Sequence, residues 1–353
     1  MTEAVAKGES VLLTQARDKF VAQFGREPVA AAAAPGRVNL IGEHALPFLT
    51  VVVGSYNNTN ECNILSILAN GDQLNASFSS STELKPGEPA WANYVKGVVA
   101  KFPAQLNGFD AVIVSDVPMG SGVSSSASLE VAFFTFLEAL VGMRVEPVKK
   151  ALLCQKAEHD FPGMPCGIMD QFIVTMGKKD HALLIDCRSL ESTQIAMDSS
   201  EAVILVVNSN VKHQLTGSEY PQRRAQCQEA AEKLKLPSLR SAKVEDLAEQ
   251  VAQLLPQKDF VAVGNNFYKS HESLSKLMEV SCPELDQLVD ILRPSPGVYG
   301  ARMTGGGFGG CVIALVKREN VEDAKRKVLS QYKGKPDFFV CQPSDGARIL
   351  KMI

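Results

Sequence analysis

The chain has 353 residues, which at roughly 150 residues per domain predicts about two domains. A hydrophobic content of 45% with 21% charged residues is typical of a folded globular protein and excludes a largely disordered chain. The net charge of −3, from 36 Lys and Arg against 39 Asp and Glu, provides neither a basic surplus for a nucleic acid nor a polybasic block for a membrane.

The first predicted element is a helix over residues 11–24, which Ser10 can cap and Gly25 ends. A strand is expected over residues 37–44. The later elements, in chain order, are a strand at 111–114, a helix that opens at Pro147, a helix over 165–176, a strand at 203–207, helices over 223–234, 244–255 and 284–292, and a strand at 311–316.

Strands and helices mix without a regular βαβ alternation, which predicts an α+β fold. A polar bend at residues 198–200 precedes the strand at 203–207. We therefore expect an N-terminal domain of residues 1–200 and a C-terminal domain of residues 201–353.

The predicted strand at 37–44 carries charge on one side. Alternation places Val38 and Leu40 on one side and Arg37, Asn39 and Glu43 on the other. Two opposite charges on one side of an otherwise apolar strand mark a candidate site.

A glycine- and serine-rich segment, residues 117–128, lies between the strand at 111–114 and a helical run from Leu129. Bare backbone N–H groups, the positive end of a helix dipole and several hydroxyls would converge there, which favours binding of a phosphate. The segment is not a Walker P-loop, because no Gly-Lys-Ser/Thr occurs in it. A serine-capped helix with a flexible lead-in is the alternative.

A second glycine-rich segment, residues 300–311, has glycine at five of the six positions 305–310. Gly305, Gly307 and Gly310 match the dinucleotide pattern G-x-G-x-x-G, but a strand is predicted next, whereas a dinucleotide-binding turn opens a helix. So many glycines indicate close approach to a ligand or to another chain segment. A tight β connection is the alternative.

Two acidic residues on predicted helices are also candidates. Asp170 lies in the first turn of an apolar helix, a place that the helix dipole alone would favour. Glu158 lies on the apolar side of the helix that opens at Pro147, so it needs a metal ion or a buried cation as partner unless it lies at the surface. The chain has no G-x-S-x-G or H-E-x-x-H motif, which argues against serine hydrolases and zinc proteases.

The cellular setting is predicted from what the sequence lacks. The most apolar run, residues 131–137, is too short to span a bilayer, and the first ten residues lack the apolar core of a signal peptide. Eight scattered cysteines favour reduced thiols, and Cys154, His159 and Cys166 fit no zinc-binding spacing. We expect a cytoplasmic enzyme or small-molecule binder.

Taken together, these segments resemble the GHMP family of small-molecule kinases, and within it the galactokinases. The resemblance covers nearly the whole chain and is densest in residues 35–44, 91–97, 117–128, 163–172 and 302–310. It implies an N-terminal domain like ribosomal protein S5 domain 2 and a C-terminal ferredoxin-like domain. ATP and the sugar would bind between them, and the anomeric hydroxyl of galactose would attack the γ-phosphoryl of MgATP. The family resemblance also implies a monomer.

The resemblance further implies roles for individual residues. The nucleotide site would consist of Trp91 beside the adenine and, around the phosphates, Gly120, Gly122, Ser124, Ser125 and Ser126. The sugar site would consist of Arg37, Glu43, His44, Gly167, Asp170 and Tyr220. Asp170 would be the catalytic base with Arg37 as its catalytic neighbour. Ser126 and Glu158 would hold Mg²⁺, and glycines 305–310 would shape the inner wall of the cleft.

The sequence departs from the family pattern in two places. After His44 the family continues with an Asp-Tyr segment and a short turn, whereas Ala45 and Leu46 follow here at once. A second shortening is expected between Phe260 and Ser270. The missing sugar-binding Asp leaves two alternatives to galactose phosphorylation, namely a protein that binds ATP and sugar without turnover and a kinase for N-acetylgalactosamine.

Overall fold

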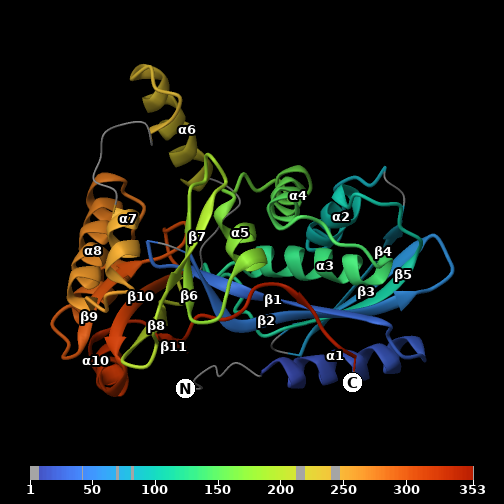
Figure 1. The fold of residues 1–353 in the computed structure, drawn as a ribbon, viewed down its shortest axis with the longest axis horizontal. Coiled ribbons are helices and arrows are strands. Elements are labelled where there is room, and N and C mark those ends of the chain that lie inside the picture. Colours follow the sequence, from blue (N-terminus) through green and yellow to red (C-terminus); the bar gives the residue numbers. More distant parts are fainter. Residues whose placement is uncertain are drawn as a thin grey trace.

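The structure, a computed structural model, describes residues 8–41, 43–68, 71–80, 83–211, 219–239 and 247–352, and of residues 44 and 219–221 it describes the backbone alone. Within these ranges the chain forms two β-sheets with helices packed against them (Figure 1). The predicted α+β class is therefore confirmed. No helix in these ranges is both long enough and apolar enough to cross a membrane.

The first sheet has eight strands, in the order β12-β1-β2-β5-β3-β4, with β6 paired to β2 and β7 to β6. All its pairs are antiparallel except β3 with β5. The strands are β1 (Ala30–Asn39), β2 (Glu43–Tyr56), β3 (Glu61–Ile67), β4 (Gln73–Ser79), β5 (Phe109–Ser115), β6 (His181–Ile185), β7 (Ser192–Ala196) and β12 (Arg348–Ile349).

Helices cover both faces of this sheet (Figure 1). Among the helices that the structure describes, α1 (Glu9–Phe24) is the one on the first face, where Leu12 and Phe20 pack in a core cluster with Val51. The other face carries α2 (Ala92–Lys101), α3 (Ser125–Val141), α4 (Pro147–Asp160) and α5 (Met169–Met176). Most of α3 is buried at the centre of this layer, and it is this packing that fixes the serine-rich N-terminus of the helix in space.

The second sheet is antiparallel throughout, in the order β11-β8-β10-β9. Its strands are β8 (Ala202–Asn208), β9 (Val298–Met303), β10 (Cys311–Lys317) and β11 (Asp337–Cys341). Helices α7 (Leu247–Leu254) and α8 (Phe260–Glu272) pack on one face, and α9 (Pro283–Leu292) and α10 (Val321–Gln331) pack on the other. A π-helical turn (Ser273–Leu277) continues α8, and a short 3₁₀ turn (Arg318–Asn320) precedes α10.

Two segments extend beyond these layers. Helix α6 (Glu219–Lys233) stands out from the body of the protein (Figure 1), and Arg224 in it donates to the carbonyl of Pro165. Strand β12 returns to pair with β1 in the first sheet, although it comes from the end of the chain. The division at residue 200 stays a prediction, because β8 begins the second sheet just after it while β12 rejoins the first.

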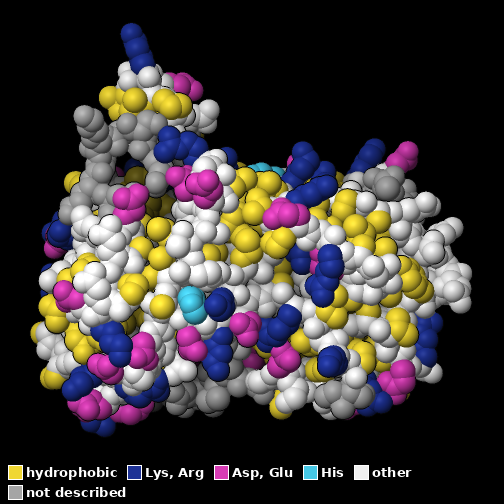
Figure 2. Space-filling view, viewed as in Figure 1, with side chains coloured by type: hydrophobic (Ala, Val, Ile, Leu, Met, Phe, Trp, Pro, Cys, Tyr) yellow, Lys and Arg dark blue, Asp and Glu magenta, His cyan; other side chains and the backbone are white. Residues whose placement is uncertain are grey.

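Charged side chains of both signs are interspersed over the face drawn in Figure 2, with hydrophobic side chains between them. No large area of that face carries a single sign. This mixed surface matches the net charge of −3.

Most predicted elements are present, with corrected ends. The strands at 111–114, 203–207 and 311–316 are confirmed within β5, β8 and β10, and the helix from Pro147 is confirmed as α4. Helix α1 begins after Gly8 with no side-chain cap, so the predicted capping role of Ser10 is wrong, whereas Gly25 ends the helix as predicted. Helix α5 begins at Met169 rather than near residue 165, and residues 244–246 of another predicted helix lie outside the described residues.

The prediction of one continuous strand over residues 37–44 is wrong, because a turn divides this segment between β1 and β2. The chain turns between β1 and β2, so Asn39 pairs with Glu43 across an antiparallel hairpin. Ile41 in this turn has a φ of 114°, a conformation that costs a β-branched residue about 1–3 kcal/mol. Because directly opposed residues project from the same face of a sheet, Asn39 and Glu43 still share a side, as the alternation predicted.

The close packing of α8 on β9 depends on Gly264 and Gly300, which gives a test of the fold. A Cβ on Gly264 would lie 1.9 Å from the carbonyl oxygen of Tyr299. Gly264→Ala is expected to lower the free energy of unfolding by about 3 kcal/mol or more, because helix and strand would have to separate. Urea denaturation measures the effect, with Gly87→Ala as control, since a Cβ there meets only the Lys96 amine at 3.8 Å. Equal stability of the two variants would contradict this account.

Candidate active site

A cavity of about 450 Å³ gathers side chains from the first sheet, the serine-rich loop, α4 and α5, and from the segment after β9. It contains most of the residues that the sequence predicts for the sugar, phosphate and metal sites. These are Arg37, Glu43, Gly120, Gly122, Ser124, Ser125, Ser126, Glu158, Gly167 and Asp170. The side chains of His44 and Tyr220 lie outside the described residues.

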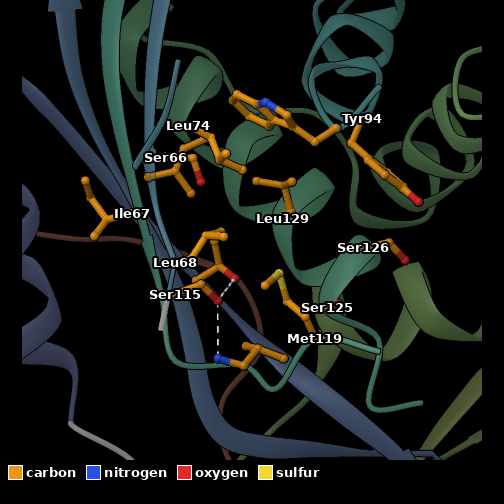
Figure 3. A pocket seen from close by; sticks show the side chains of 14 residues that line it. Ser66, Ile67, Leu68, Leu74, Tyr94, Ser115, Met119, Ser125, Ser126 and Leu129 are labelled. Atoms are coloured by element: carbon orange, nitrogen blue, oxygen red, sulfur yellow. Dashed lines mark hydrogen bonds between the residues drawn. The ribbon is translucent and has the colours of Figure 1, made fainter. Parts of the chain in front are cut away.

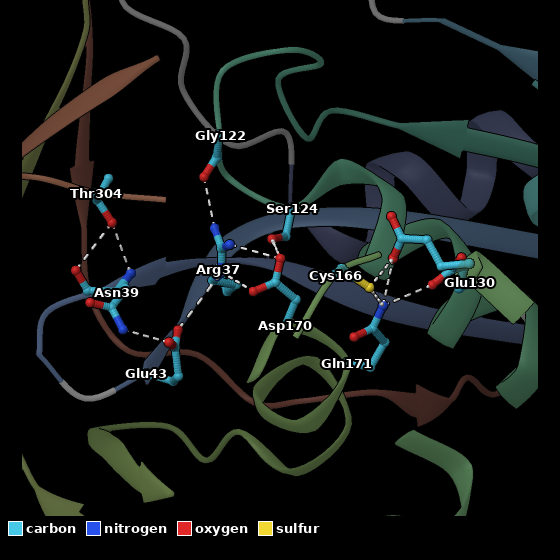
Figure 4. A network of polar contacts seen from close by, with 11 residues as sticks. Arg37, Asn39, Glu43, Gly122, Ser124, Glu130, Cys166, Asp170, Gln171 and Thr304 are labelled. Atoms are coloured by element: carbon cyan, nitrogen blue, oxygen red, sulfur yellow. Dashed lines mark hydrogen bonds and ion pairs between the residues drawn. The ribbon is translucent and has the colours of Figure 1, made fainter. Parts of the chain in front are cut away.

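The centre of the cavity is an ion pair between Arg37 and Asp170. Arg37 Nε donates to Asp170 Oδ1 at 2.8 Å and Nη2 donates to Oδ2 at 2.7 Å, which is a bidentate arrangement. Arg37 Nη1 donates to the carbonyl oxygen of Gly122 at 2.7 Å. The Ser124 hydroxyl also donates to Asp170 Oδ2. One arginine from β1 thus ties the first turn of α5 to the serine-rich loop (Figure 4).

The serine-rich loop adopts a backbone that suits a phosphate. Gly120, Gly122 and Ser124 all have positive φ, between 58° and 73°, immediately before α3 begins at Ser125. Ser124 makes no capping bond with its side chain, so the alternative of a serine-capped helix is wrong. The N–H groups at the start of α3 remain available to an anion.

A second, mainly apolar pocket of about 220 Å³ adjoins the cavity. The two share Tyr94, Ser125 and Ser126 among their lining residues, so they meet at the start of α3. Trp91 lines the second pocket and also packs against the core, and Figure 3 shows Leu74 and Leu129 projecting into it. The pocket therefore offers apolar surface to a planar ring, beside a loop that suits phosphate.

Glu43 is a buried carboxylate with one oxygen unsatisfied. Its Oε1 accepts from Asn39 Nδ2 at 2.6 Å, whereas Oε2 has no hydrogen-bond partner and lies 3.7 Å from Arg37 Nε. Burial raises the pKa of Glu43 to about 7, although Arg37 opposes the shift. An acceptor oxygen left free at the edge of a cavity suits a ligand hydroxyl.

A group of three buried polar side chains, Glu130, Glu158 and Gln171, lies beside Asp170, and Figure 4 labels Glu130 and Gln171. Gln171 Nε2 donates to Glu158 Oε2 at 2.6 Å and to Glu130 Oε2 at 3.1 Å. Glu158 is 4% exposed, so it is not the surface residue of the alternative prediction. Burial raises the pKa of Glu130 well above its usual range, and the nearby Glu158 adds to this shift.

The residues around Ser126 and Glu158 fit a Mg²⁺ ion that carries nucleotide phosphates. Magnesium prefers oxygen ligands and commonly takes only one or two carboxylates from the protein, with phosphates and waters filling its other positions. The described residues contain no group of three His, Cys, Asp or Glu side chains that could hold a metal alone. A hydroxyl and a carboxylate facing one cavity beside a phosphate loop are consistent with that partial set of ligands.

The glycines at 305–310 let the second sheet approach the serine-rich loop. A Cβ on Gly305 would lie 3.1 Å from the carbonyl oxygen of Gly122, and one on Gly310 would lie 3.2 Å from that of Ser121. Both glycines have positive φ. Gly305 and Gly306 also line the cavity, so this segment contacts another chain segment and forms a wall of the site, as predicted.

Sequence reasoning missed several residues of this site. Asn39 lies on the same side of the predicted strand as Arg37 and Glu43, and this alternation could have identified it as a site residue. Glu130 follows Ser126 by one helical turn, so helical periodicity could have placed it near the site. Gln171 directly follows Asp170, and consecutive residues of a helix do not share a face, so periodicity could not have indicated it. Arg302 reaches the site from the second sheet, and no local pattern in the sequence indicates that.

Comparison with known proteins identifies the family. Residues 93–178 match the model for the GHMP kinases N terminal domain, residues 251–334 match GHMP kinases C terminal, and residues 18–45 match the galactokinase galactose-binding signature. Human galactokinase is 45% identical over 379 residues, covering 96% of this chain and 97% of the relative, and the Bos taurus enzyme is 44% identical with the same coverage. The chain belongs to the galactokinase family.

Solved structures agree with this galactokinase assignment. A crystal structure of Lactococcus lactis galactokinase complexed with galactose superposes with a TM-score of 0.89 at 28% identity, covering 96% of this chain and 100% of that one. Methanococcus jannaschii mevalonate kinase has a TM-score of 0.67 at 19% identity, which shows the shared GHMP fold alone. The predicted GHMP kinase fold is confirmed.

The alignment with human galactokinase also bears on the predicted shortenings. It spans 379 residues, which exceeds the 353 of this chain, so the chain lacks internal residues that this relative has. Placing the missing residues after His44 and before Ser270 stays a prediction. In the structure, β2 runs on from Glu43 without interruption, and Ala45 and Leu46 are buried within it.

The raised pKa of Glu43 predicts a stability effect in the sugar-free protein. The native state holds the proton up to about pH 7 and the unfolded state only to about 4.5, so the wild type loses stability as pH rises between these values. Glu43→Gln carries no charge, so its free energy of unfolding is expected to rise relative to that of the wild type as the pH increases. The difference should reach up to about 3 kcal/mol above pH 7. Urea denaturation from pH 4.5 to 8 measures the difference. Glu61→Gln, at an exposed position in β3, is the control, and parallel curves for Glu43→Gln and wild type would contradict the assignment.

Proposed function

We propose that this galactokinase family member transfers the γ-phosphoryl group of ATP to the anomeric hydroxyl of galactose, giving galactose 1-phosphate and ADP. The observation that carries the proposal is the bidentate Arg37–Asp170 pair beside Ser124 of the phosphate loop, within one cavity. The names of the relatives, including a galactokinase complexed with galactose, give the same substrate.

The nucleotide would extend across both hollows of the site. The adenine occupies the apolar pocket beside Trp91, and the phosphates pass Tyr94 and Ser126 to reach the serine-rich loop. The phosphate oxygens then accept from backbone N–H groups at the start of α3, where the helix dipole also favours negative charge. This route directs the γ-phosphoryl group toward Asp170.

The sugar would lie between Glu43 and Asp170. The free Oε2 of Glu43 accepts a hydrogen bond from one sugar hydroxyl, which gives this buried atom the partner it lacks. Asp170 receives the anomeric hydroxyl and holds it in line with the phosphoryl group. Gly167 leaves room for the ring, because a Cβ there would meet no atom within 4 Å.

Positioning and charge neutralisation then supply most of the acceleration. In a loose phosphoryl-transfer transition state the attacking oxygen needs little activation, so Asp170 takes its proton late. Arg37 keeps the Asp170 carboxylate in place with two hydrogen bonds and brings positive charge to the reacting group. Ser126 and Glu158 would hold Mg²⁺, which when bound neutralises charge on the phosphates.

The two alternative functions from the sequence have no structural observation in their favour. A sugar panel tests them together, with ATP consumption measured for galactose, N-acetylgalactosamine and glucose, with Mg²⁺ and again after chelation by EDTA. We expect Mg²⁺-dependent turnover with galactose. Nucleotide binding without turnover on any sugar, or turnover with N-acetylgalactosamine instead, would overturn the proposal.

The catalytic role of Asp170 predicts a split between rate and binding. Asp170→Asn is expected to lower kcat by about 10²-fold or more, since an amide cannot take the hydroxyl proton. Nucleotide affinity should be unchanged, and the chain's single tryptophan, Trp91, reports it by fluorescence on titration with ADP. Asp160→Asn serves as control, because Asp160 only pairs with Lys101 on the surface. Full turnover in Asp170→Asn would refute the role.

A further inference from the structure

A chain of hydrogen bonds connects the second sheet to Glu43. Arg302, at the end of β9, donates from Nη1 to Asn39 Oδ1 at 3.1 Å. Asn39 Nδ2 in turn donates to Glu43 Oε1 at 2.6 Å. The side-chain amide of Asn39 therefore lies between a cation from one sheet and a carboxylate from the other.

The orientation of that amide is determined by its two neighbours. A guanidinium can only donate, so the amide oxygen must face Arg302, which leaves the amide nitrogen to donate to Glu43. Any loss of Arg302 would remove the contact that selects this orientation. Arg302 is 6% exposed, and its Nε is held by the carbonyl oxygen of Met303 at 2.9 Å.

The backbone of Asn39 is fixed from the same direction. Its N–H donates to the Thr304 hydroxyl oxygen at 3.1 Å, and that hydroxyl donates back to the Asn39 carbonyl oxygen at 3.1 Å (Figure 4). Residues 302 and 304 thus hold both the backbone and the side chain of Asn39, although they lie far from it in the sequence. The second sheet specifies where the Glu43 carboxylate points.

The orientation of Glu43 matters because only one of its oxygens is available. With Oε1 engaged by Asn39, Oε2 is left without a hydrogen-bond partner. Burial lowers the pKa of Arg302 to about 10, and the carboxylate of Glu43 opposes this shift, so the two charges support each other through the amide between them. A rotated amide would present like groups to each neighbour and release Glu43.

We propose that Arg302 and Asn39 are positioning residues for sugar binding, which act by turning the free oxygen of Glu43 into the sugar site. The proposal rests on the proposed function, because it requires a sugar hydroxyl at Glu43. It assigns to the second sheet a part in sugar recognition, in addition to its contact with the phosphate loop.

Exchanging the amide and the carboxylate between positions 39 and 43 tests this chain of hydrogen bonds. Asn39→Asp keeps the acceptor for Arg302 but removes the donor to Glu43, and Glu43→Gln turns a donor into the cavity in place of Oε2. In the double variant, the new amide at position 43 can donate to the new carboxylate at position 39, which leaves the amide oxygen facing the cavity as an acceptor. Each single change should weaken galactose binding roughly tenfold or more, and the double variant should recover to within roughly threefold of wild type.

The measurements are galactose affinity by calorimetry, KM for galactose and for ATP, and ADP affinity from Trp91 fluorescence. Galactose affinity should weaken and KM for galactose should rise, while KM for ATP and the ADP affinity stay unchanged. Arg302→Lys should have a smaller effect than Arg302→Gln. Arg318→Gln is the matched control. Arg318 also lies next to the second sheet, where it donates to the carbonyl oxygen of Ser200 at 3.2 Å, but it takes no part in the chain of hydrogen bonds to Glu43. Urea denaturation shows whether each variant is folded.

The outcomes separate the two proposals. If wild type binds no galactose, the proposed function fails. If wild type binds galactose and Asn39→Asp binds it equally well, the positioning role fails while the function stands. If the double variant is no better than the worse single variant, the two residues do not act through a shared hydrogen bond, and the inference is overturned. If the affinities for galactose and for ATP weaken together, the contact is only structural and the inference is overturned.

Discussion

The Arg37 guanidinium makes the interactions on which the candidate active site depends. It is buried on β1 and binds the Asp170 carboxylate with two nitrogens and the Gly122 carbonyl with the third. Three elements that carry different parts of the chemistry are therefore held by one rigid planar group. Lysine could not replace it, because a single ammonium cannot make this forked arrangement.

Local pattern predicted the parts of this site, while their assembly required the fold. Arg37, Glu43 and Glu158 became candidates because each placed charge on an apolar element, and such charges need partners. The role of Asp170 came from the family resemblance instead. The turn at Ile41 was missed, because a β-branched residue with positive φ contradicts local preference and is imposed by the hairpin. Arg302 was missed for another reason, since its contact with Asn39 joins two sheets and leaves no periodic signal in either segment.

One unsatisfied polar atom faces the cavity where the ligand is expected. Among the described residues, the buried side-chain atoms without a hydrogen-bond partner include Glu43 Oε2, whose residue lines the cavity, whereas Arg26 Nε, Ser199 Oγ and Tyr268 Oη lie elsewhere. Such atoms are rare in folded proteins, because each costs about 1–3 kcal/mol. The free oxygen of Glu43 therefore lowers the stability of the empty protein and leaves an acceptor in place for a ligand hydroxyl.

The return of β12 to the first sheet affects how the chain can fold during synthesis. Leu350 packs in the core beneath β1 and its N–H donates to the Ala31 carbonyl, while Arg348 pairs with Glu9 of α1. The edge of β1 remains unpaired until residues 348–350 have been synthesised, and an open edge of that kind invites association with other chains. A chain without residues 348–352 would keep this edge exposed for its lifetime, although every residue of the cavity would still be present.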